Sequence, residues 1–316
     1  MWQIIGQQPA VDRLRRDVEK GALPHALLLT GRSGSGRTTL AVELAKTLNC
    51  VSDDAPCQRC VHCHQIAAGT HPDVSIVESA SGRDSIAIQQ IRDLRGGASL
   101  RPFQGRWKVY IIAGAERLTP QAADALLKTL EEPPPNVVFV LTALDMESVP
   151  PTVVSRCRLL TLRVPRESEI VDLLARELDP SEAARIARLA RGNVGWAVRA
   201  ARQPKLASEE EQLERALAGV FEMGMEDRLK LAESLTADRK DRANIRHVLE
   251  LMLVELRRML PVPPAGTNDG PEQPAPAAPE LEQVPAMFAA VRLAMERIDQ
   301  NVDPRLTLET LFLGLP

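Results

Sequence analysis

Gly31-Arg-Ser-Gly-Ser-Gly-Arg37-Thr38-Thr39 is the stretch that decides the fold of this 316-residue chain. It has the frame G-x-x-x-x-G-R-T of a phosphate-binding P-loop, in which glycines let backbone N–H groups surround phosphates. The apolar run 26–30 predicts a buried strand before the loop, and residues 38–48 predict a helix after it. A strand, a loop and a helix in this order predict the fold of a nucleoside triphosphatase.

The loop lacks the lysine that normally reaches the β- and γ-phosphates, because Arg37 takes its place. A guanidinium is a planar fork rather than a compact point charge, so the exchange is not conservative at a tightly enclosed phosphate. The candidate nucleotide-binding residues belong to the loop and the first helical turn: Gly31, Gly34, Gly36, Arg37, Thr38 and Thr39. We expect the fold without the activity. Passive nucleotide binding stays open, as does a glycine-rich turn that never held nucleotide.

A second departure from a hydrolase lies where the strand predicted for residues 108–112 ends. An aspartate there would hold Mg²⁺, and a following glutamate would polarise the attacking water. The chain reads Ala113-Gly114 instead. Glu116 lies too far along to replace either group without rebuilding the strand end. Two separate losses predict that ATP with Mg²⁺ is not hydrolysed here.

Four of the five cysteines fall within fourteen residues, as Cys50-x6-Cys57-x2-Cys60-x2-Cys63. Two short Cys-x2-Cys steps place thiolates on a tight knuckle, and an upstream cysteine at a helix end can complete a tetrahedron around Zn²⁺. We predict a structural zinc site with these four ligands, because a full set leaves no position open for water. The alternatives are His62 or His64 in place of one cysteine, and four unligated thiols.

Composition limits the classes of protein that remain. The chain is 44% hydrophobic, its net charge is −3, and 3% of its residues are aromatic. No apolar run approaches the roughly 20 residues that span a bilayer, and the N-terminus lacks a signal-peptide pattern, so we expect a cytoplasmic protein. A zinc-dependent nucleic-acid-binding module is a further hypothesis, but it lacks a basic stripe and aromatic side chains for base stacking.

Strand-like runs recur at 74–77, 108–112, 137–141 and 159–162, with helical patterns at 85–95 and 120–132. Strands that alternate with helices predict an α/β fold with a parallel, helix-covered sheet. The helix at 120–132 is well bounded, since Thr119 can cap it, Pro120 suits its first position and prolines follow it.

Three domains are expected from these patterns. The first covers 1–164 and contains the P-loop and the zinc module at 50–63, the second is a small helical domain at 165–205, and the third is a helical domain at 206–316. A hinge is predicted at Gln203-Pro204-Lys205. The third domain is interrupted at 261–279 by seven prolines, which favour a flexible insertion over a packed core.

Several motifs together point to one family. They are Trp2 to Gln7 with His25-Ala26, the P-loop, the four-cysteine insert, the helix Ala125-Leu-Leu-Lys-Thr-Leu-Glu-Glu-Pro133, and Ser155-Arg156-Cys157. In combination they closely resemble bacterial clamp-loader subunits of the AAA+ class, densely over 1–200 and weakly beyond. The resemblance implies an AAA+ domain, a small helical lid domain and a helical collar domain that forms oligomers.

Two kinds of subunit compete within this family. The tau/gamma ATPase subunits keep the lysine and the acidic pair, whereas the delta-prime subunits of DNA polymerase III commonly have a degenerate nucleotide site. This chain resembles the delta-prime kind, and Gly195 stands where the ATPases carry a sensor arginine. The resemblance implies a non-hydrolysing clamp-loader subunit, with an active tau/gamma-like ATPase as the alternative. The implied partners are tau/gamma subunits, a delta subunit, the sliding clamp and primer-template DNA, within the polymerase III holoenzyme.

The resemblance also implies a catalytic role in trans for Arg156. In related clamp loaders the arginine of the Ser-Arg-Cys motif reaches the γ-phosphate of ATP bound by the neighbouring subunit. A permanent charge on a planar donor fork suits this role, because it stabilises the negative charge spread over the transferred phosphoryl group. The alternative is a surface or interdomain ion pair, and Arg158 is a second arginine close by.

Overall fold

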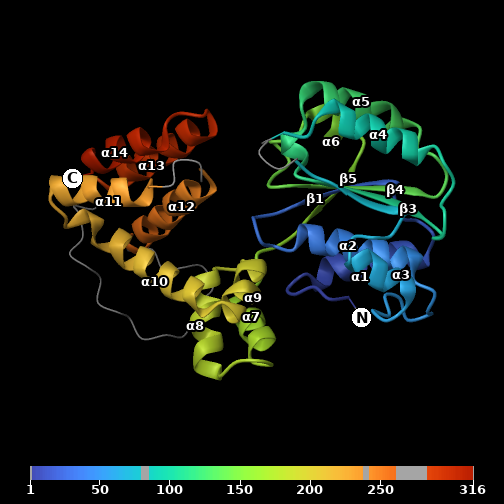
Figure 1. The fold of residues 1–316 in the computed structure, drawn as a ribbon, viewed down its shortest axis with the longest axis horizontal. Coiled ribbons are helices and arrows are strands. Elements are labelled where there is room, and N and C mark those ends of the chain that lie inside the picture. The colour runs from blue at the N-terminus through green and yellow to red at the C-terminus, as the bar shows by residue number, and fades with distance from the viewer. Residues whose placement is uncertain (1, 80–84, 238–241, 261–282, 316) are drawn as a thin grey trace. The chain divides into compact units, whose positions relative to one another are not determined.

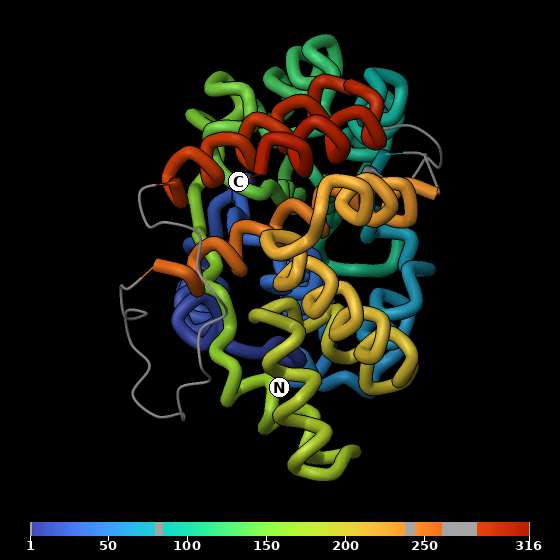
Figure 2. The backbone as a smooth tube through the Cα atoms, turned by 90° about the vertical axis from the view of Figure 1, so that its left-hand side faces the viewer, coloured from blue at the N-terminus to red at the C-terminus, as the bar shows by residue number. Residues whose placement is uncertain are grey.

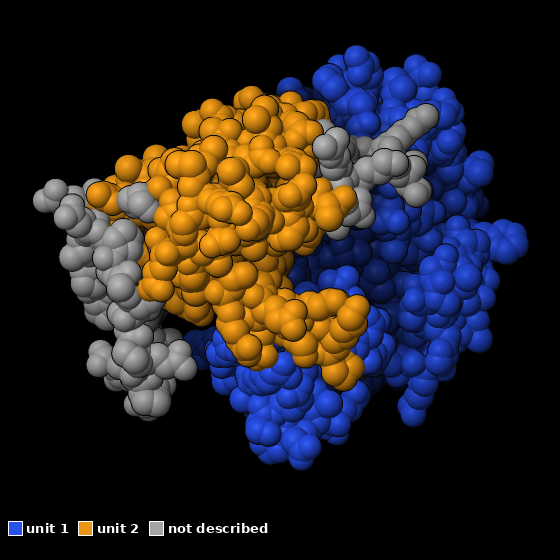
Figure 3. All heavy atoms as spheres, turned by 60° about the vertical axis from the view of Figure 1, so that its left-hand side comes forward, with its two compact units in different colours: residues 1–203 blue, residues 204–316 orange. Residues whose placement is uncertain are grey.

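The computed structural model describes residues 2–79, 85–237, 242–260 and 283–315. They divide into two units, residues 1–203 and 204–316 (Figure 3). The boundaries expected after residues 164 and 205 stay predictions. The proline-rich stretch 261–279 lies outside the described residues.

The strands of the first unit form one sheet in the order β2-β3-β4-β1-β5, and every neighbouring pair is parallel. Parallel neighbours need crossover connections, so helices cover both faces and the inner strands are continuous apolar runs. This confirms the predicted parallel α/β sheet. The strands are β1 (Ala26–Thr30), β2 (Val74–Val77), β3 (Lys108–Ala113), β4 (Val137–Ala143) and β5 (Arg158–Thr161).

Two layers of helices enclose this sheet (Figure 1). One face is covered by α1 (Gln8–Glu19), α2 (Arg37–Asn49) and α3 (Val61–Ala67). The other is covered by α4 (Ile88–Ala98), α5 (Pro120–Glu131) and α6 (Pro151–Val154). Because side chains alternate along a strand, β1 serves both layers: Leu27 lies in the core of α1 and α2, and Leu28 in the core of α4 and α5.

A buried carboxylate anchors the loop between α4 and β3. Asp73 is 3% exposed, and its carboxylate accepts hydrogen bonds from the backbone N–H groups of Phe103 (2.6 Å), Gln104 (2.9 Å) and Gly105 (2.8 Å). Burial works against its ionisation, but these three donors and the charge of Lys108 together lower the pKa of Asp73. The loop is therefore held by a charged acceptor inside the protein.

Three short helices complete the first unit: α7 (Glu167–Leu174), α8 (Pro180–Ala190) and α9 (Val194–Arg202). They pack on one another, with Ile170, Ile186 and Ala197 fully buried. The boundary between the two units falls between residues 203 and 204, within the stretch 203–205 where the sequence predicts a hinge, and α10 begins at Pro204. A hinge there stays a prediction. Proline is well suited to the first turn of a helix, where its missing N–H costs nothing, so only Gln203 separates α9 from α10.

The described part of the second unit is helical throughout. It comprises α10 (Pro204–Ala218), the short 3-10 helix η2 (Gly219–Phe221), α11 (Met225–Leu235), α12 (Arg242–Arg258), α13 (Val284–Asp299) and α14 (Pro304–Leu313). α11 packs on α14 and α12 on α13, and Figure 2 shows α13 and α14 side by side at the red end of the chain. Val248, Met252 and Phe312 form part of one core. Among the described helices, none has the length and apolar content needed to cross a membrane.

Candidate functional site

The P-loop lies between the end of β1 and the start of α2. Gly36 precedes the helix with φ of +91°, and Gly34 has φ of +76°, conformations that favour glycine. The predicted residues Gly31, Gly34 and Gly36 therefore curve the loop, while Arg37, Thr38 and Thr39 form the first turn of α2. Backbone N–H groups at such a helix start can donate hydrogen bonds to an anion. The arrangement has the form of a phosphate loop, and nucleotide binding by these residues stays a prediction.

Two side chains from other parts of the first unit lie on this loop. A Cβ atom added to Gly34 would lie 2.0 Å from Oδ1 of Asn193, so the Asn193 amide packs directly against it. Asn193 also caps α9 by accepting a hydrogen bond from the Trp196 N–H at 2.9 Å. Gln7 donates from Nε2 to the Ser35 carbonyl at 3.0 Å. The contact of Asn193 with the loop was not predicted from the sequence.

Arg37 is partly buried, and the charges of Glu116, Arg117 and Asp145 act on it. Burial lowers the pKa of Arg37, whereas the negative charges of Glu116 and Asp145 act in the opposite direction. Arg37 Nη1 and Glu116 Oε2 are both buried without a hydrogen-bond partner among the described residues. The negative charge of Glu116 thus favours the charged form of Arg37, an effect that sequence reasoning did not consider when it weighed Glu116 only for Mg²⁺ binding.

The end of β3 presents no carboxylate where a hydrolase needs two. Gly114 follows Ala113 with φ of +86°, and the 3-10 helix η1 (Ala115–Arg117) begins directly after it. The Gly114 N–H donates to the carbonyl of Thr142 at 3.2 Å and to its Oγ1 at 3.1 Å. A glutamate at position 114 would be strained in this conformation, because L side chains rarely adopt positive φ. The local backbone thus differs from one that supports an acidic pair.

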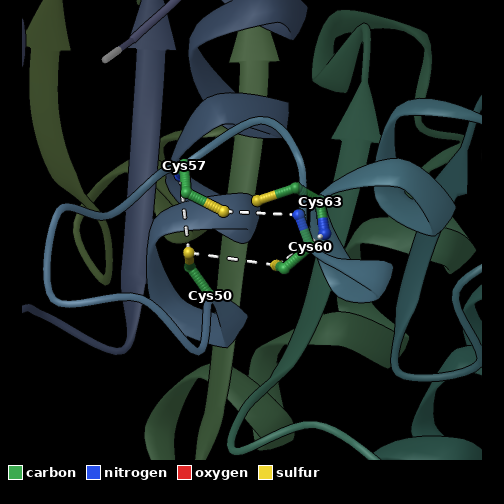
Figure 4. Close-up of side chains that lie close together, drawn as sticks. All are labelled: Cys50, Cys57, Cys60 and Cys63. Atoms are coloured by element: carbon green, nitrogen blue, oxygen red, sulfur yellow. Dashed lines mark hydrogen bonds between the residues drawn. The ribbon is translucent and has the colours of Figure 1, made fainter.

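The four clustered cysteines come together in space as well as in sequence. Their sulfur atoms lie within 4.8 Å of one another and point toward a common centre (Figure 4). Zinc bound to four sulfurs at about 2.3 Å would place the sulfurs roughly 3.8 Å apart, so a small contraction suffices. Cys50 is the C-cap residue of α2, and Cys60 is the N-cap residue of α3. These residues fit a tetrahedral metal ion.

Backbone N–H groups favour the thiolate form within this cluster. Cys57 N–H donates to Cys50 Sγ at 3.4 Å, and Cys60 N–H donates to Cys57 Sγ at 3.3 Å. The Arg59 N–H is the main cause that lowers the pKa of Cys57 to about 6. Burial instead raises the pKa of Cys63 to about 12. The largest influence thus differs between the two thiols: a backbone N–H lowers the pKa of Cys57, and burial raises the pKa of Cys63.

The alternative histidine ligands lie outside the cluster. Among the described residues, the group of converging ligand atoms contains the four cysteines and no histidine. His62 Nδ1 lies 2.9 Å from Nε2 of the buried His71, and His64 is exposed. The geometry therefore favours the all-cysteine set over the histidine alternatives.

Arg156 lies just after α6 and is held by its own chain. Its Nε donates to Glu131 Oε1 at 2.8 Å, its Nη2 also contacts that oxygen, and its Nη1 donates to the Thr152 carbonyl at 2.8 Å. The side chains are 32% exposed for Arg156 and 50% for Glu131, so the ion pair is at the surface. Glu131 is the last residue of α5, a partner that sequence spacing could not identify.

Arg158 provides a matched comparison two residues away. It is the first residue of β5, its side chain is 37% exposed, and its Nη1 lies 3.1 Å from Asp17 Oδ2. Both arginines thus make one ion pair with similar exposure, but they lie on different elements. The structure does not bring either arginine to the P-loop of the same chain through any contact among the described residues.

Comparisons with known proteins give matches that cover about half of this chain. A model of the family described as DNA polymerase III, delta subunit, matches residues 6–166. The DNA polymerase III subunit gamma of Buchnera aphidicola is 37% identical over 174 residues, which cover 54% of this chain and 47% of that protein. The subunit delta' of Haemophilus influenzae is 39% identical over 160 residues, which cover 50% of this chain and 49% of that protein.

The match to these relatives spans about half of each of them. A solved structure from Thermotoga maritima, of a protein related to the DNA polymerase III gamma subunit, has a TM-score of 0.51 and 20% identity. The alignment of the two structures covers 96% of this chain and 97% of the Thermotoga chain. At that level of identity the likeness shows a shared fold.

Proposed function

The chain belongs to the DNA polymerase III delta-subunit family, and from this premise we propose that it is a non-hydrolysing subunit of the replicative clamp loader. It acts beside tau/gamma ATPase subunits and a delta subunit, and helps to place the sliding clamp on primed DNA in the cytoplasm. In this proposal it has the AAA+ architecture, with residues 165–205 as the lid and 206–316 as the collar. The relatives named gamma and delta' support a place in polymerase III.

The observation that carries the non-hydrolysing role is the missing chemistry at the end of β3. Ala113 cannot ligate Mg²⁺, and Gly114 has a backbone conformation that disfavours a glutamate. Arg37 replaces the lysine, and burial lowers the pKa of its guanidinium while the charge of Glu116 acts in the opposite direction. Backbone N–H groups remain available, so weak passive nucleotide binding is compatible with the proposal.

The alternative is an active tau/gamma-like ATPase, which is favoured by the identity of 37% to a gamma subunit. It would require a Mg²⁺ ligand and a water-polarising acid from elsewhere in the chain. Glu116 is the nearest candidate, but its charge acts on Arg37. We therefore prefer the delta-prime-like role.

We further propose that Cys50, Cys57, Cys60 and Cys63 hold one structural Zn²⁺. Zinc bound there would fix the knuckle, and four protein ligands would leave no open coordination position for catalysis. The backbone N–H groups that donate to the sulfurs would then orient the ligands and offset their negative charge.

Arg156 acts in this proposal as an arginine finger for ATP bound by the adjacent ATPase subunit. Its surface ion pair with Glu131 is a contact that a stronger anion can replace, because exposed pairs contribute about 0–1 kcal/mol. A γ-phosphate would offer several acceptor oxygens to the same guanidinium fork.

ATP turnover separates the two candidate functions. The purified chain should release no phosphate above background with Mg²⁺, alone or with primed DNA, while a complex with a tau/gamma-type partner should hydrolyse ATP. As a matched control, the partner should carry an alanine in place of its P-loop lysine, which should abolish the activity of the complex. Metal-dependent turnover by the isolated chain in the usual enzyme range of roughly 1–10³ s⁻¹ would refute the proposed function.

A further inference from the structure

A buried ion pair lies in the middle of α2, away from the nucleotide and arginine sites. Glu43 is 2% exposed and Lys46 is 4% exposed, and Lys46 Nζ lies 2.7 Å from Glu43 Oε1. Burying two charges is costly unless further hydrogen bonds satisfy them. The partners that supply these bonds therefore indicate which segments the pair holds together.

The first partner comes from the cysteine knuckle. Gln58 lies between Cys57 and Cys60, and its Nε2 donates to Glu43 Oε2 at 2.6 Å while its Oε1 accepts from Lys46 Nζ at 2.8 Å. Both ends of one amide thus contact both charges. Gln58 has φ of +62°, so the backbone of the knuckle takes a specific turn to bring this side chain inward.

The second partner comes from the N-terminal segment. The Gln3 N–H donates to the same Oε2 atom of Glu43 at 3.0 Å. The residues that follow cover the P-loop: a Cβ on Gly36 would lie 3.3 Å from Ile4 Cδ1, and Gln7 bonds the Ser35 carbonyl at 3.0 Å. One carboxylate therefore joins the cysteine knuckle to the segment that lies on the phosphate loop.

We propose that Glu43 and Gln58 are positioning residues that couple metal binding at the four cysteines to the order of residues 2–7. A metal ion that fixes Cys57 and Cys60 also fixes the backbone of Gln58 between them, and so holds its amide on the Glu43–Lys46 pair. Without the metal the knuckle is free to open, the amide withdraws, and water reaches the carboxylate that anchors Gln3. The inference rests on the proposed metal site.

Hydrogen exchange of the full chain, followed by mass spectrometry, tests this coupling. In the wild-type protein, removal of zinc should speed exchange at residues 2–7 by about tenfold or more, equivalent to about 1.4 kcal/mol. Gln58→Asn tolerates positive φ but is too short to reach Glu43. This variant should still contain zinc by elemental analysis, and yet residues 2–7 should exchange as fast as in the zinc-free wild type. Arg59→Ala, at the exposed neighbouring position, should behave like the wild type.

The outcomes separate the coupling from the metal site itself. Wild-type protein purified without chelator and found free of zinc would overturn the proposed metal site, and the coupling with it. The coupling alone would be overturned if zinc-loaded Gln58→Asn kept wild-type protection at residues 2–7. It would also be overturned if removing zinc from the wild-type protein left the exchange rate at residues 2–7 unchanged. Glu43→Gln is a second test variant, because it removes the charge that Gln58, Lys46 and Gln3 share. It should also contain zinc while residues 2–7 exchange as fast as in the zinc-free wild type.

Discussion

Replacing Arg156 with alanine should separate the stability of the chain from the activity of the complex. The side chain makes one exposed ion pair with Glu131 and donates to the Thr152 carbonyl. Exposed ion pairs contribute about 0–1 kcal/mol, so the free energy of unfolding should fall by no more than about 1 kcal/mol. An arginine finger, in contrast, contributes roughly 10³–10⁵ in rate at the site it serves. The expected pattern is a folded, zinc-containing, assembling protein with a defective neighbouring site.

The assay is DNA-stimulated phosphate release and clamp loading by complexes reconstituted with wild-type, Arg156→Ala or Arg158→Ala protein. Arg158 is the matched control, because its side chain has similar exposure and also makes one ion pair, with Asp17. Both variants should lose similar stability in denaturant titrations, but only Arg156→Ala should lose activity sharply. Equal clamp-loading rates for Arg156→Ala and wild type would refute the finger role, and equal losses for both variants would indicate a structural effect.

Three further predictions concern the cysteines, the Asp73 anchor and the surface pair. Cys57→Ser should lose the single bound zinc in elemental analysis, because it removes one of four ligands, while Cys157→Ser should keep it, since Cys157 lies in another core. Asp73→Asn should lower the free energy of unfolding by about 1.5–3 kcal/mol at neutral pH, because three N–H groups lose a charged acceptor. Since the native pKa of Asp73 is lowered, its stabilisation is present above the usual aspartate pKa and is lost as pH falls through the native value. The difference between the two proteins should therefore narrow in acid, and a constant difference would contradict the charge argument. Glu131→Gln should change the free energy of unfolding by less than about 1 kcal/mol in urea, and a loss above about 2 kcal/mol would show that this pair supports the fold.

The strands could be predicted because their sequences are simple and their surroundings uniform. β1 and β4 are buried along their whole length, so they read as unbroken apolar runs such as Ala26–Thr30. α3 was missed because Val61–Ala67 alternates cysteine and histidine, and its apolar pattern is too short to indicate a helix. The cysteine cluster was predictable from spacing alone, because its ligands lie close together in the chain.

Contacts between distant segments could not be predicted from local pattern. Glu131 and Arg156 are separated by 25 positions and Gln3 and Glu43 by 40, and no periodicity links either pair. Nothing in the sequence predicted that the Asn193 side chain packs against Gly34 of the P-loop. Such contacts depend on how helices pack on the sheet, and this information is distributed over the whole first unit.

The packing around the P-loop also explains why its glycines say less about activity than its charged groups do. Gly34 has positive φ, and an added Cβ would lie 2.0 Å from Oδ1 of Asn193. Gly36 also has positive φ and lies close to Ile4. The fold therefore requires glycine at both positions whether or not a phosphate ever binds, so the glycine frame would persist after hydrolysis was lost. The chain departs from an ATPase at other positions, where Arg37 replaces the lysine and Ala113-Gly114 replaces the acidic pair.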